Sequence, residues 1–303
     1  MKISAVINTY NEEKNLERAL RSLVWAEEII VVDMESTDKT LEIAAKFNAK
    51  VYSHPYVGYV EPARNLGLEK ANGDWIFILD ADEEATLLLG KKLRQLSENI
   101  EGKTYFRLPR KNILFDKWIQ HTGWWPDYQI RFFRKGSVTW GDEIHSIPET
   151  RGKGEDIPAS EENALIHHNY QTVEQFVTRM NRYTTIEARL LYNQKQPFEW
   201  KKLIERSIGE FLGRYFAGEG YKDGVHGLGL SLLQSFYQVL VQLKLWQAYK
   251  FEEKQVGLAD SEKVITSSLG ELKYWIDNKK IEEEKGQLKK NILKLKSRLP
   301  LNL

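Results

Sequence analysis

Acidic side chains stand directly after one of the apolar segments of the chain. Asp80 and Asp82 follow the apolar run 75–79, and Glu83 and Glu84 continue the acidic cluster. Carboxylates massed at the end of a buried segment repel one another and lose hydration, so a cation or a proton must offset their charge. Oxygen ligands suit Mg2+ and Mn2+, which retain water and also bind the phosphate groups of a substrate. The pattern predicts a divalent metal at Asp80 and Asp82.

Polar residues also follow two earlier apolar runs. The segment 9–12 reads Thr-Tyr-Asn-Glu and has none of the glycines of a dinucleotide fingerprint or a phosphate-binding loop. Asp33 follows the run 29–32, and a carboxylate at the end of a strand can accept hydrogen bonds from a ribose or a base. Asp38 begins the next helical pattern, where a role as a helix cap explains it equally well.

These polar segments share one position relative to the elements that the sequence predicts. Short apolar runs at 2–8, 28–33, 50–53 and 74–79 alternate with helical patterns at 12–25, 37–46 and 61–71. This alternation predicts a parallel sheet covered by helices, and the ligands of such sheets bind beyond the carboxyl ends of the strands. We therefore expect the segments 9–12, 33–38 and 80–84 to line one site.

The pattern changes twice further along the chain. From about Lys103 to His168, short strands with aromatic and basic residues are separated by Gly and Pro turns, and after Thr172 the sequence is helical almost throughout. We expect an α/β catalytic domain over residues 1–170 and a helical region over residues 171–303.

The composition narrows the classes of function. The chain has 303 residues, with 44 Lys and Arg against 43 Asp and Glu, and no cysteine. The balanced charge argues against a nucleic-acid partner, which a strongly basic surface would attract. The lack of cysteine excludes disulfides, thiolate zinc sites, iron–sulfur clusters and cysteine nucleophiles. The opening apolar run is too short for the apolar region of a signal peptide, so we expect a cytoplasmic protein.

Several segments resemble the successive signatures of family 2 glycosyltransferases. They are Asn-Thr-Tyr-Asn-Glu-Glu at 8–13, Val-Val-Asp-Met-Glu-Ser-Thr-Asp at 31–38, Pro-Ala-Arg-Asn-Leu-Gly at 62–67 and Gly-Asp-Trp-Ile-Phe-Ile-Leu-Asp-Ala-Asp-Glu at 73–83. A further segment, Gly-Trp-Trp-Pro-Asp-Tyr-Gln-Ile-Arg-Phe-Phe-Arg at 123–134, is followed by Ile144 and His145. It resembles the subgroup of bacterial enzymes that build the lipopolysaccharide core, including the core β-1,4-glucosyltransferases.

The resemblance implies a GT-A fold, the Rossmann-like fold of nucleotide-diphospho-sugar transferases, with a helical C-terminal extension. It also implies a nucleotide-diphosphate sugar donor, expected to be a UDP-sugar, a divalent metal (Mg2+ or Mn2+) and inversion at the anomeric carbon. The metal would neutralise the diphosphate leaving group. Asp80 and Asp82 are the implied metal ligands, with Asp82 as the main one. Carried over position by position, the donor-binding residues are Thr9, Tyr10, Asn11, Glu12, Asp33, Ser36, Arg64, Asp80, Ala81 and Asp82.

An inverting transfer needs a general base to take the proton of the acceptor hydroxyl. Asp127 is the favoured candidate, because it matches the Pro-Asp position of the subgroup. It stands beside Trp124 and Trp125, whose rings suit the apolar face of a sugar on the acceptor side. The alternative for Asp127 is a turn carboxylate paired with Arg131 or Arg134.

Other candidates on the acceptor side are less specific. Many relatives carry His-Glu where His145 is here followed by serine, so a base at that glutamate cannot be transferred. Glu143 and Glu149 remain competitors for the base, and His145 is expected near the diphosphate or the metal. His167 and His168 end a predicted strand, where adjacent side chains point to opposite faces, and we interpret them as structural or at most as one pocket-lining residue.

Two segments of the helical region suit a membrane surface. The stretch 225–243 has no Asp, Glu, Lys or Arg, but polar residues at helical spacing predict an amphipathic helix rather than a membrane span. Its apolar face, from Leu228 to Leu243, is expected either to pack on the catalytic domain, the default, or to lie in a bilayer interface. The basic stretch 285–298 predicts a solvated helix or a contact with anionic lipid. The polar stripe is Ser231, Gln234, Ser235, Gln238 and Gln242.

The leading hypothesis is transfer of a sugar to a lipid-linked or cell-envelope glycan, such as lipopolysaccharide core, by a protein peripheral to the inner face of the cell membrane. Transfer to a polyprenyl phosphate or a protein is an alternative that depends on the acceptor-side segment 111–148. A non-catalytic scaffold that binds nucleotide sugars is a second alternative, because the glutamate after His145 is missing.

Overall fold

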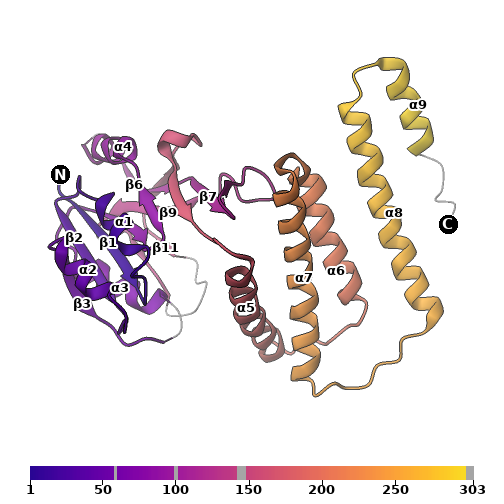
Figure 1. Ribbon diagram of the computed structural model, residues 1–303, viewed down its shortest axis with the longest axis horizontal. Coiled ribbons are helices and arrows are strands. Elements are labelled where there is room, and N and C mark those ends of the chain that lie inside the picture. Colours follow the sequence, from indigo (N-terminus) through magenta and orange to yellow (C-terminus); the bar gives the residue numbers. More distant parts are fainter. Residues whose placement is uncertain (58–59, 99–101, 142–147, 298–303) are drawn as a thin grey trace. The chain divides into compact units, whose positions relative to one another are not determined.

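The chain forms two compact units in a computed structural model that describes residues 1–57, 60–98, 102–141 and 148–297 (Figure 1). Unit 1 comprises Met1–Leu114 and Trp124–Asn169, and unit 2 comprises Phe115–Gly123 and Tyr170–Leu303. The short segment Phe115–Gly123 thus groups with the helices that follow residue 169. Nothing in the local sequence pattern indicates this grouping, because it depends on contacts with residues about a hundred positions later.

The main sheet of unit 1 is parallel where the sequence predicts it. Its strands follow the order β12-β6-β9-β4-β1-β2-β3. The strands β4, β1, β2 and β3 run parallel, β9 is antiparallel to both of its neighbours, and β12 is parallel to β6. The bounds are β1 (Ile3–Thr9), β2 (Glu28–Asp33), β3 (Lys50–Ser53), β4 (Trp75–Asp80), β6 (Lys103–Leu108), β9 (Gln129–Arg134) and β12 (Lys153–Asp156).

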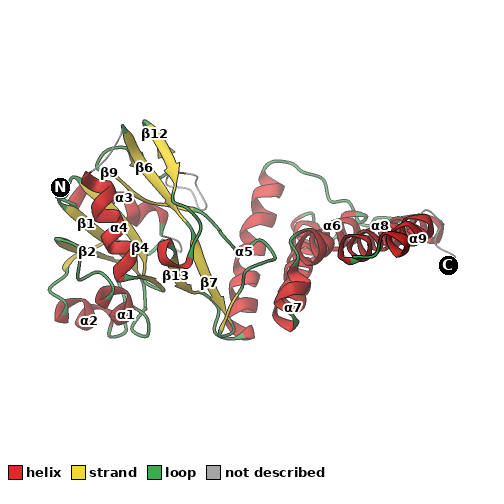
Figure 2. Cartoon of the chain, turned by 90° about the horizontal axis from the view of Figure 1, so that it is seen from above, coloured by secondary structure: helices red, strands yellow, loops and turns green. Residues whose placement is uncertain are grey.

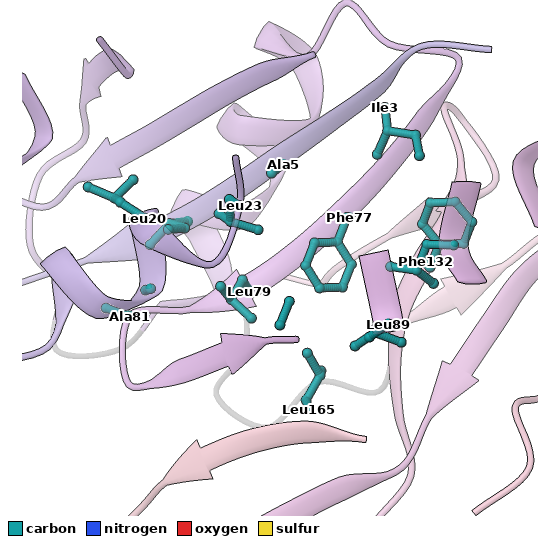
Figure 3. Close-up of a cluster of buried hydrophobic side chains, with 14 of the residues drawn as sticks. Ile3, Ala5, Leu20, Leu23, Phe77, Leu79, Ala81, Leu89, Phe132 and Leu165 are labelled. Atoms are coloured by element: carbon teal, nitrogen blue, oxygen red, sulfur yellow. The ribbon is translucent and has the colours of Figure 1, made fainter. Parts of the chain in front are cut away.

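Helices cover both faces of this sheet because its central strands are buried along their length. One core cluster joins the sheet to α1 and α4 through residues such as Leu20, Phe77 and Leu89 (Figure 3). A second cluster joins the other face to α3. There Gly67 permits close packing, since a Cβ atom on it would lie 2.4 Å from Val6 Cγ1. The helices are α1 (Leu16–Arg21), α2 (Thr40–Lys46), α3 (Glu61–Lys70) and α4 (Leu87–Glu98).

A smaller sheet in unit 1 aligns residues that are far apart in the sequence. β13 (Leu165–His168) pairs with β5 (Glu83–Ala85) on one side and with β7 (Arg110–Leu114) on the other. His167 therefore lies opposite Glu83 on β5 and opposite Asn112 on β7. The remaining short elements of unit 1 are β10 (Val138–Thr139), β11 (Glu149–Thr150) and the 3-10 turn η1 (Glu161–Asn163).

Unit 2 is helical apart from the short strand β8 (Lys117–Trp118). α7 packs against both α5 and α6, and α8 packs against α6 and α9. Figure 2 shows α6, α8 and α9 nearly end-on and α5 along its length. Thr172 caps α5 by accepting a hydrogen bond from the Gln175 N–H. The elements are α5 (Val173–Asn193), α6 (Lys202–Leu212), the π-helical turn η2 (Gly213–Ala217), the 3-10 turn η3 (Gly220–Asp223), α7 (Val225–Ala248), α8 (Leu258–Glu283) and α9 (Gln287–Ser297).

Polar and apolar residues of α7 both face its neighbours within unit 2. Ser231, Gln242, Leu230 and Val241 are buried, whereas Leu232 and Phe236 are about half exposed. Gly227 permits close packing, because a Cβ atom on it would lie 1.8 Å from the Gly220 carbonyl oxygen. Packing of the apolar face on the catalytic domain stays a prediction. In the described part of the chain, no helix combines the length and apolar character needed to cross a membrane.

Candidate functional site

Strand register brings predicted residues to one edge of the main sheet. Thr9 lies opposite Asp33 in the β1–β2 pair, and Asn8 lies opposite Asp80 in the β1–β4 pair. The strand order reverses at β1, because β2 and β3 lie on one side of it and β4 lies on the other. Ligands of open α/β sheets bind at such a reversal, beyond the carboxyl ends of the strands. This edge is therefore the candidate site.

Asp33 is a buried carboxylate in which one of the two oxygens has a hydrogen-bond partner. Oδ2 accepts a hydrogen bond from the Ser36 N–H at 3.0 Å, whereas Oδ1 is buried without a partner. An unpaired buried acceptor costs about 1–3 kcal/mol, which a ligand N–H or O–H would recover. Tyr10 extends the same edge, and its ring stacks on that of Tyr56 with a centroid separation of 3.8 Å.

Other predicted donor-binding residues connect the loops at this edge. The Asn11 N–H donates to Ser36 Oγ at 2.9 Å, and Asn11 Oδ1 accepts from the Thr37 N–H at 2.8 Å. Glu12 Oε2 accepts from Asn15 Nδ2 at 2.7 Å. Asn11, Glu12 and Ser36 thus hold the loops after β1 and β2 in shape, and the Asp38 carboxylate adds to this by accepting from backbone N–H groups.

A chain of buried charges runs across the site. Asp80 Oδ1 accepts from Arg64 at 3.0 Å, and both Asp80 oxygens bind Arg131. Arg131 also contacts Glu83 at 2.8 Å, and Glu83 lies 3.4 Å from Arg110. Glu83 is fully buried, and Arg131 is nearly so. We call Arg64, Asp80, Arg131, Glu83, Arg110 and Asp127 the charge ladder, because Arg110 continues it to Asp127.

Opposite charges outweigh the effect of burial on the pKa values of Asp80 and Arg131. Burial alone raises the pKa of the Asp80 carboxyl, but Arg131 and Arg64 outweigh that effect and hold its pKa well below the usual range. Burial likewise lowers the pKa of Arg131, while Asp80 and Glu83 raise it to a larger extent. Both oxygens of Asp80 contact guanidinium groups, and a metal would be reached through the second lone pair of Oδ2 or by exchange of one of those contacts.

Asp82 faces a histidine that the sequence analysis treats as structural. Asp82 Oδ2 lies 3.5 Å from Nε2 of the buried His167, whose Nδ1 lies 2.6 Å from Asn112 Oδ1. Both N–H bonds of the Asn112 amide are used by obligate acceptors, the Trp124 carbonyl and Asp127 Oδ2, each at 2.8 Å. Asn112 must then accept from His167, so Nδ1 carries a proton and Nε2 faces the Asp82 carboxylate.

An imidazole nitrogen and a carboxylate oxygen at this separation are held together by a cation between them. A proton on Nε2 or a metal ion would serve, and a metal-bound histidine commonly donates its other ring N–H to an oxygen acceptor, as His167 does to Asn112. The pair of a carboxylate and an imidazole fits a divalent transition metal. Within residues 1–57, 60–98, 102–141 and 148–297, no cluster of three or more His, Asp or Glu side chains is preformed around a metal position.

Asp127 is held by neighbours on three sides. Its Oδ2 accepts from Arg110 Nε and from Asn112 Nδ2, each at 2.8 Å, and its Oδ1 accepts from Gln129 at 3.1 Å. Burial raises the pKa of Asp127, but Arg110 and these donors outweigh it and lower the pKa. The partner of Asp127 is therefore Arg110, not the Arg131 or Arg134 that the turn alternative proposes.

The other acceptor-side candidates are the two tryptophans, Glu149, His145 and Glu143. Trp124 and Trp125 are half-buried next to Asp127, and the Trp124 carbonyl shares the Asn112 amide with the Asp127 carboxylate. Glu149 is exposed on β11. His145 and Glu143 lie outside the described residues.

Comparison with known families identifies the part of the chain that carries this site. A family model described as Glycosyl transferase family 2 matches residues 4–148. Residues 4–148 are a family 2 glycosyltransferase domain. The predicted family and enzyme class are thereby confirmed, as is the predicted GT-A fold with its helical C-terminal region.

Alignments with related proteins cover most of the length of this chain. An uncharacterized glycosyltransferase of Rickettsia conorii is 28% identical over 268 residues, covering 86% of this chain and 94% of the relative. The lipopolysaccharide core biosynthesis glycosyltransferase LpsC of Rhizobium meliloti is 23% identical, covering 83% and 94%. Among solved structures, the glucosyl-3-phosphoglycerate synthase of Mycobacterium tuberculosis, in complex with Mn2+, UDP and its product, is 28% identical over 35% of this chain and 43% of that chain, with a TM-score of 0.32.

The sequence motifs assign no role at the site to five residues that the structure places there. Glu83 and Arg131 lie within the motifs, and His167 is interpreted from the sequence as structural or pocket-lining, whereas Arg110 and Asn112 lie outside the motifs. All five join the site through contacts between distant parts of the chain. The sequence offers one indication of Arg110 and Arg131. Several carboxylates predicted at the end of a buried strand require basic partners elsewhere in the chain. No such signal distinguishes His167 from His168, since the strand register alone decides which of them faces Asp82.

Proposed function

We propose that this glycosyltransferase moves a sugar, with inversion, from a UDP-sugar to a glycan or glycolipid acceptor of the cell envelope, and that it uses a divalent metal. The observation that carries the proposal is the Asp82–His167 pair beside the buried charge ladder. It is a metal-type ligand pair at the edge of the sheet where a donor diphosphate would lie.

The preference for uridine rests on Asp33. Its buried, unpaired Oδ1 would accept a hydrogen bond from the ligand. Uracil, thymine and guanine offer a ring N–H, whereas cytosine and adenine offer only an exocyclic amino group. Uracil is, among these bases, that of the expected UDP-sugar. Tyr10 supplies an aromatic face for the base. Arg64, which is held against Asp80, would place positive charge near the donor phosphates.

Asp82 and His167 are the residues that would hold the metal, with Asp80 recruited from its arginine contacts. A mixed oxygen and nitrogen ligand set favours Mn2+ over Mg2+, which prefers oxygen ligands alone. When bound, the metal would supply Lewis acidity that stabilises the diphosphate leaving group. Asn112 contributes by fixing the tautomer and ring orientation of His167.

Asp127 would act as the general base. Its carboxylate is ionised at neutral pH, as a general base must be, and it would accept the proton of an acceptor hydroxyl as that oxygen attacks the anomeric carbon; its lowered pKa makes it a weaker base than a free aspartate. Arg110 and Asn112 fix the orientation of this carboxylate. Trp124 and Trp125 would provide rings for the apolar face of the acceptor sugar.

The acceptor class rests on the relative LpsC, a lipopolysaccharide core biosynthesis glycosyltransferase that aligns with most of the chain. Such an acceptor would be met at the inner face of the cell membrane, where the protein would bind peripherally.

A screen of nucleotide sugars tests the proposal. Thermal unfolding is measured with UDP-, GDP-, ADP- and dTDP-sugars, each with and without Mn2+, since a ligand that binds the native state raises the apparent stability. The proposal requires the largest shift for a UDP-sugar with Mn2+. A larger shift with a GDP- or ADP-sugar, or no effect of Mn2+, would contradict it. Donor binding without turnover across an acceptor panel would instead support the scaffold alternative.

A further inference from the structure

The exposed face of α7 is apolar over most of the helix. Its exposed residues recur at intervals of three, four or seven positions, and the stretch 225–243 contains no Asp, Glu, Lys or Arg. At 1.5 Å per residue this face is about 27 Å long. The exposed fractions are 84% for Val225, 38% for Leu228, 53% for Leu232, 50% for Phe236 and 37% for Leu243.

The opposite side of α7 carries the polar stripe together with buried apolar residues: Leu230 and Val241 are fully buried, and Leu245 is nearly so. Ser231 and Gln242 are buried, Ser235 Oγ donates to the Ser207 carbonyl of α6 at 2.7 Å, and the Tyr237 hydroxyl donates to Glu187 of α5 at 2.7 Å. A surface helix of a water-soluble bundle usually turns a polar face to water, whereas the exposed face of α7 is apolar. An exposed apolar face of this kind marks a surface that meets an apolar partner or a membrane.

Charge on the same unit identifies the occupant. α9 exposes Leu288, Ile292 and Leu295 on one side, and the stretch 285–297 contains lysines but no acidic residue. Basic helices with an exposed apolar side bind the interface of anionic bilayers, where each lysine near the surface is attracted by the lipid head groups.

We propose that the α7 face, defined as Val225, Leu228, Leu232, Phe236 and Leu243, docks on the surface of an anionic lipid bilayer, with the lysines of α9 adding electrostatic attraction. α7 would lie in the plane of the interface with its opposite side turned to α5 and α6. The inference rests on the proposed function in one respect: the lipid-linked acceptor proposed there would be presented at the same bilayer surface.

Co-sedimentation with vesicles tests the α7 face. The full chain is mixed with vesicles of phosphatidylcholine, with or without phosphatidylglycerol, and the bound fraction is measured. We expect the double variant Leu232→Glu/Phe236→Glu to lose at least about tenfold in binding to the anionic vesicles. The matched control Leu87→Glu/Leu88→Glu changes exposed leucines of unit 1, which are 63% and 56% exposed, and should bind as the unchanged chain does.

The lysines of α9 give an independent test. The triple variant Lys289→Gln/Lys294→Gln/Lys296→Gln should lose roughly fivefold per lysine in binding to anionic vesicles and should not change in its binding to neutral ones. UDP-dependent thermal shifts of each variant verify folding and test the donor site separately, so failure of one proposal is distinguishable from failure of the other. The docking proposal is overturned if the unchanged chain stays in the supernatant with anionic vesicles. It is also overturned if the α7 variant binds vesicles as the unchanged chain does but sediments at a different velocity in their absence, because that result would assign the face to a dimer interface.

Discussion

Arg110 binds Asp127 through two of its nitrogens: Nε lies 2.8 Å and Nη2 lies 2.6 Å from Asp127 Oδ2. The same guanidinium lies 3.4 Å from the buried Glu83, so the proposed base is the last member of the charge ladder. Its ionisation and orientation are therefore set by a neighbour that the motifs do not reveal.

Replacement of the proposed base should separate chemistry from donor binding. Asp127→Asn keeps the shape of the side chain but removes its ability to take a proton, so we expect kcat to fall by roughly 10²–10⁴-fold. UDP binding, measured by calorimetry, should stay within about twofold of the unchanged chain. A variant that retains full transfer would assign the base to another residue, and Glu149→Gln is the matched comparison.

The pH dependence of transfer should depend on Arg110. Because the pKa of Asp127 is lowered in the folded protein, activity should persist as the pH falls to the usual carboxyl range and decline only below it. In Arg110→Met, the positive charge that outweighs the effect of burial on the pKa of Asp127 is lost. The pKa of Asp127 should then rise, and the acid limb of the pH–rate profile should move toward neutral pH. An unchanged acid limb in this variant would show that another group controls it.

The charge ladder should contribute strongly to folding. Arg131→Met leaves Asp80 and Glu83 buried with fewer partners, and loss of one member of a buried ion pair costs about 3–5 kcal/mol. Arg134 lies on the same strand but is exposed, with its guanidinium 5.9 Å from the Trp75 ring centroid, so Arg134→Met should cost less than about 1 kcal/mol. Urea denaturation of both variants measures the free energies of unfolding. Equal losses would contradict the proposed role of the ladder.

The base specificity should depend on Asp33. We expect UDP methylated at N3 to bind roughly 10–100-fold more weakly than UDP, because it cannot donate to the buried Oδ1. In Asp33→Ala the two ligands should bind about equally, since the acceptor is gone. If methylation is equally costly in both proteins, the N3–H contacts another group.

The order of elements in unit 1 follows directly from the sequence. Apolar runs bounded by polar turns are sufficient to predict β1 to β4, because buried parallel strands tolerate few polar side chains. The position of Asp33, Asp80 and Asp82 after those strands then predicts their location at one edge.

What the sequence does not reveal depends on distance and on orientation. Arg131 and Asp80 are separated by 51 positions, and no local pattern pairs them. In α7, periodicity shows a polar stripe, but it does not show which residues face the neighbouring helices. Small residues such as Gly227 and Ser231 lie on the buried side, where Gly227 permits close packing.

The central claim is that Asp82 and His167 hold a divalent metal for the donor diphosphate. Its most direct test is calorimetric titration of Mn2+ into the UDP-saturated protein, compared among the unchanged chain, Asp82→Asn, His167→Gln and the control His168→Gln, whose ring lies near Glu84 instead. We expect Asp82→Asn and His167→Gln to weaken Mn2+ binding by more than the roughly 10–100-fold that loss of an outer partner costs, and His168→Gln to match the unchanged chain. Undiminished Mn2+ binding in Asp82→Asn and His167→Gln would contradict the claim.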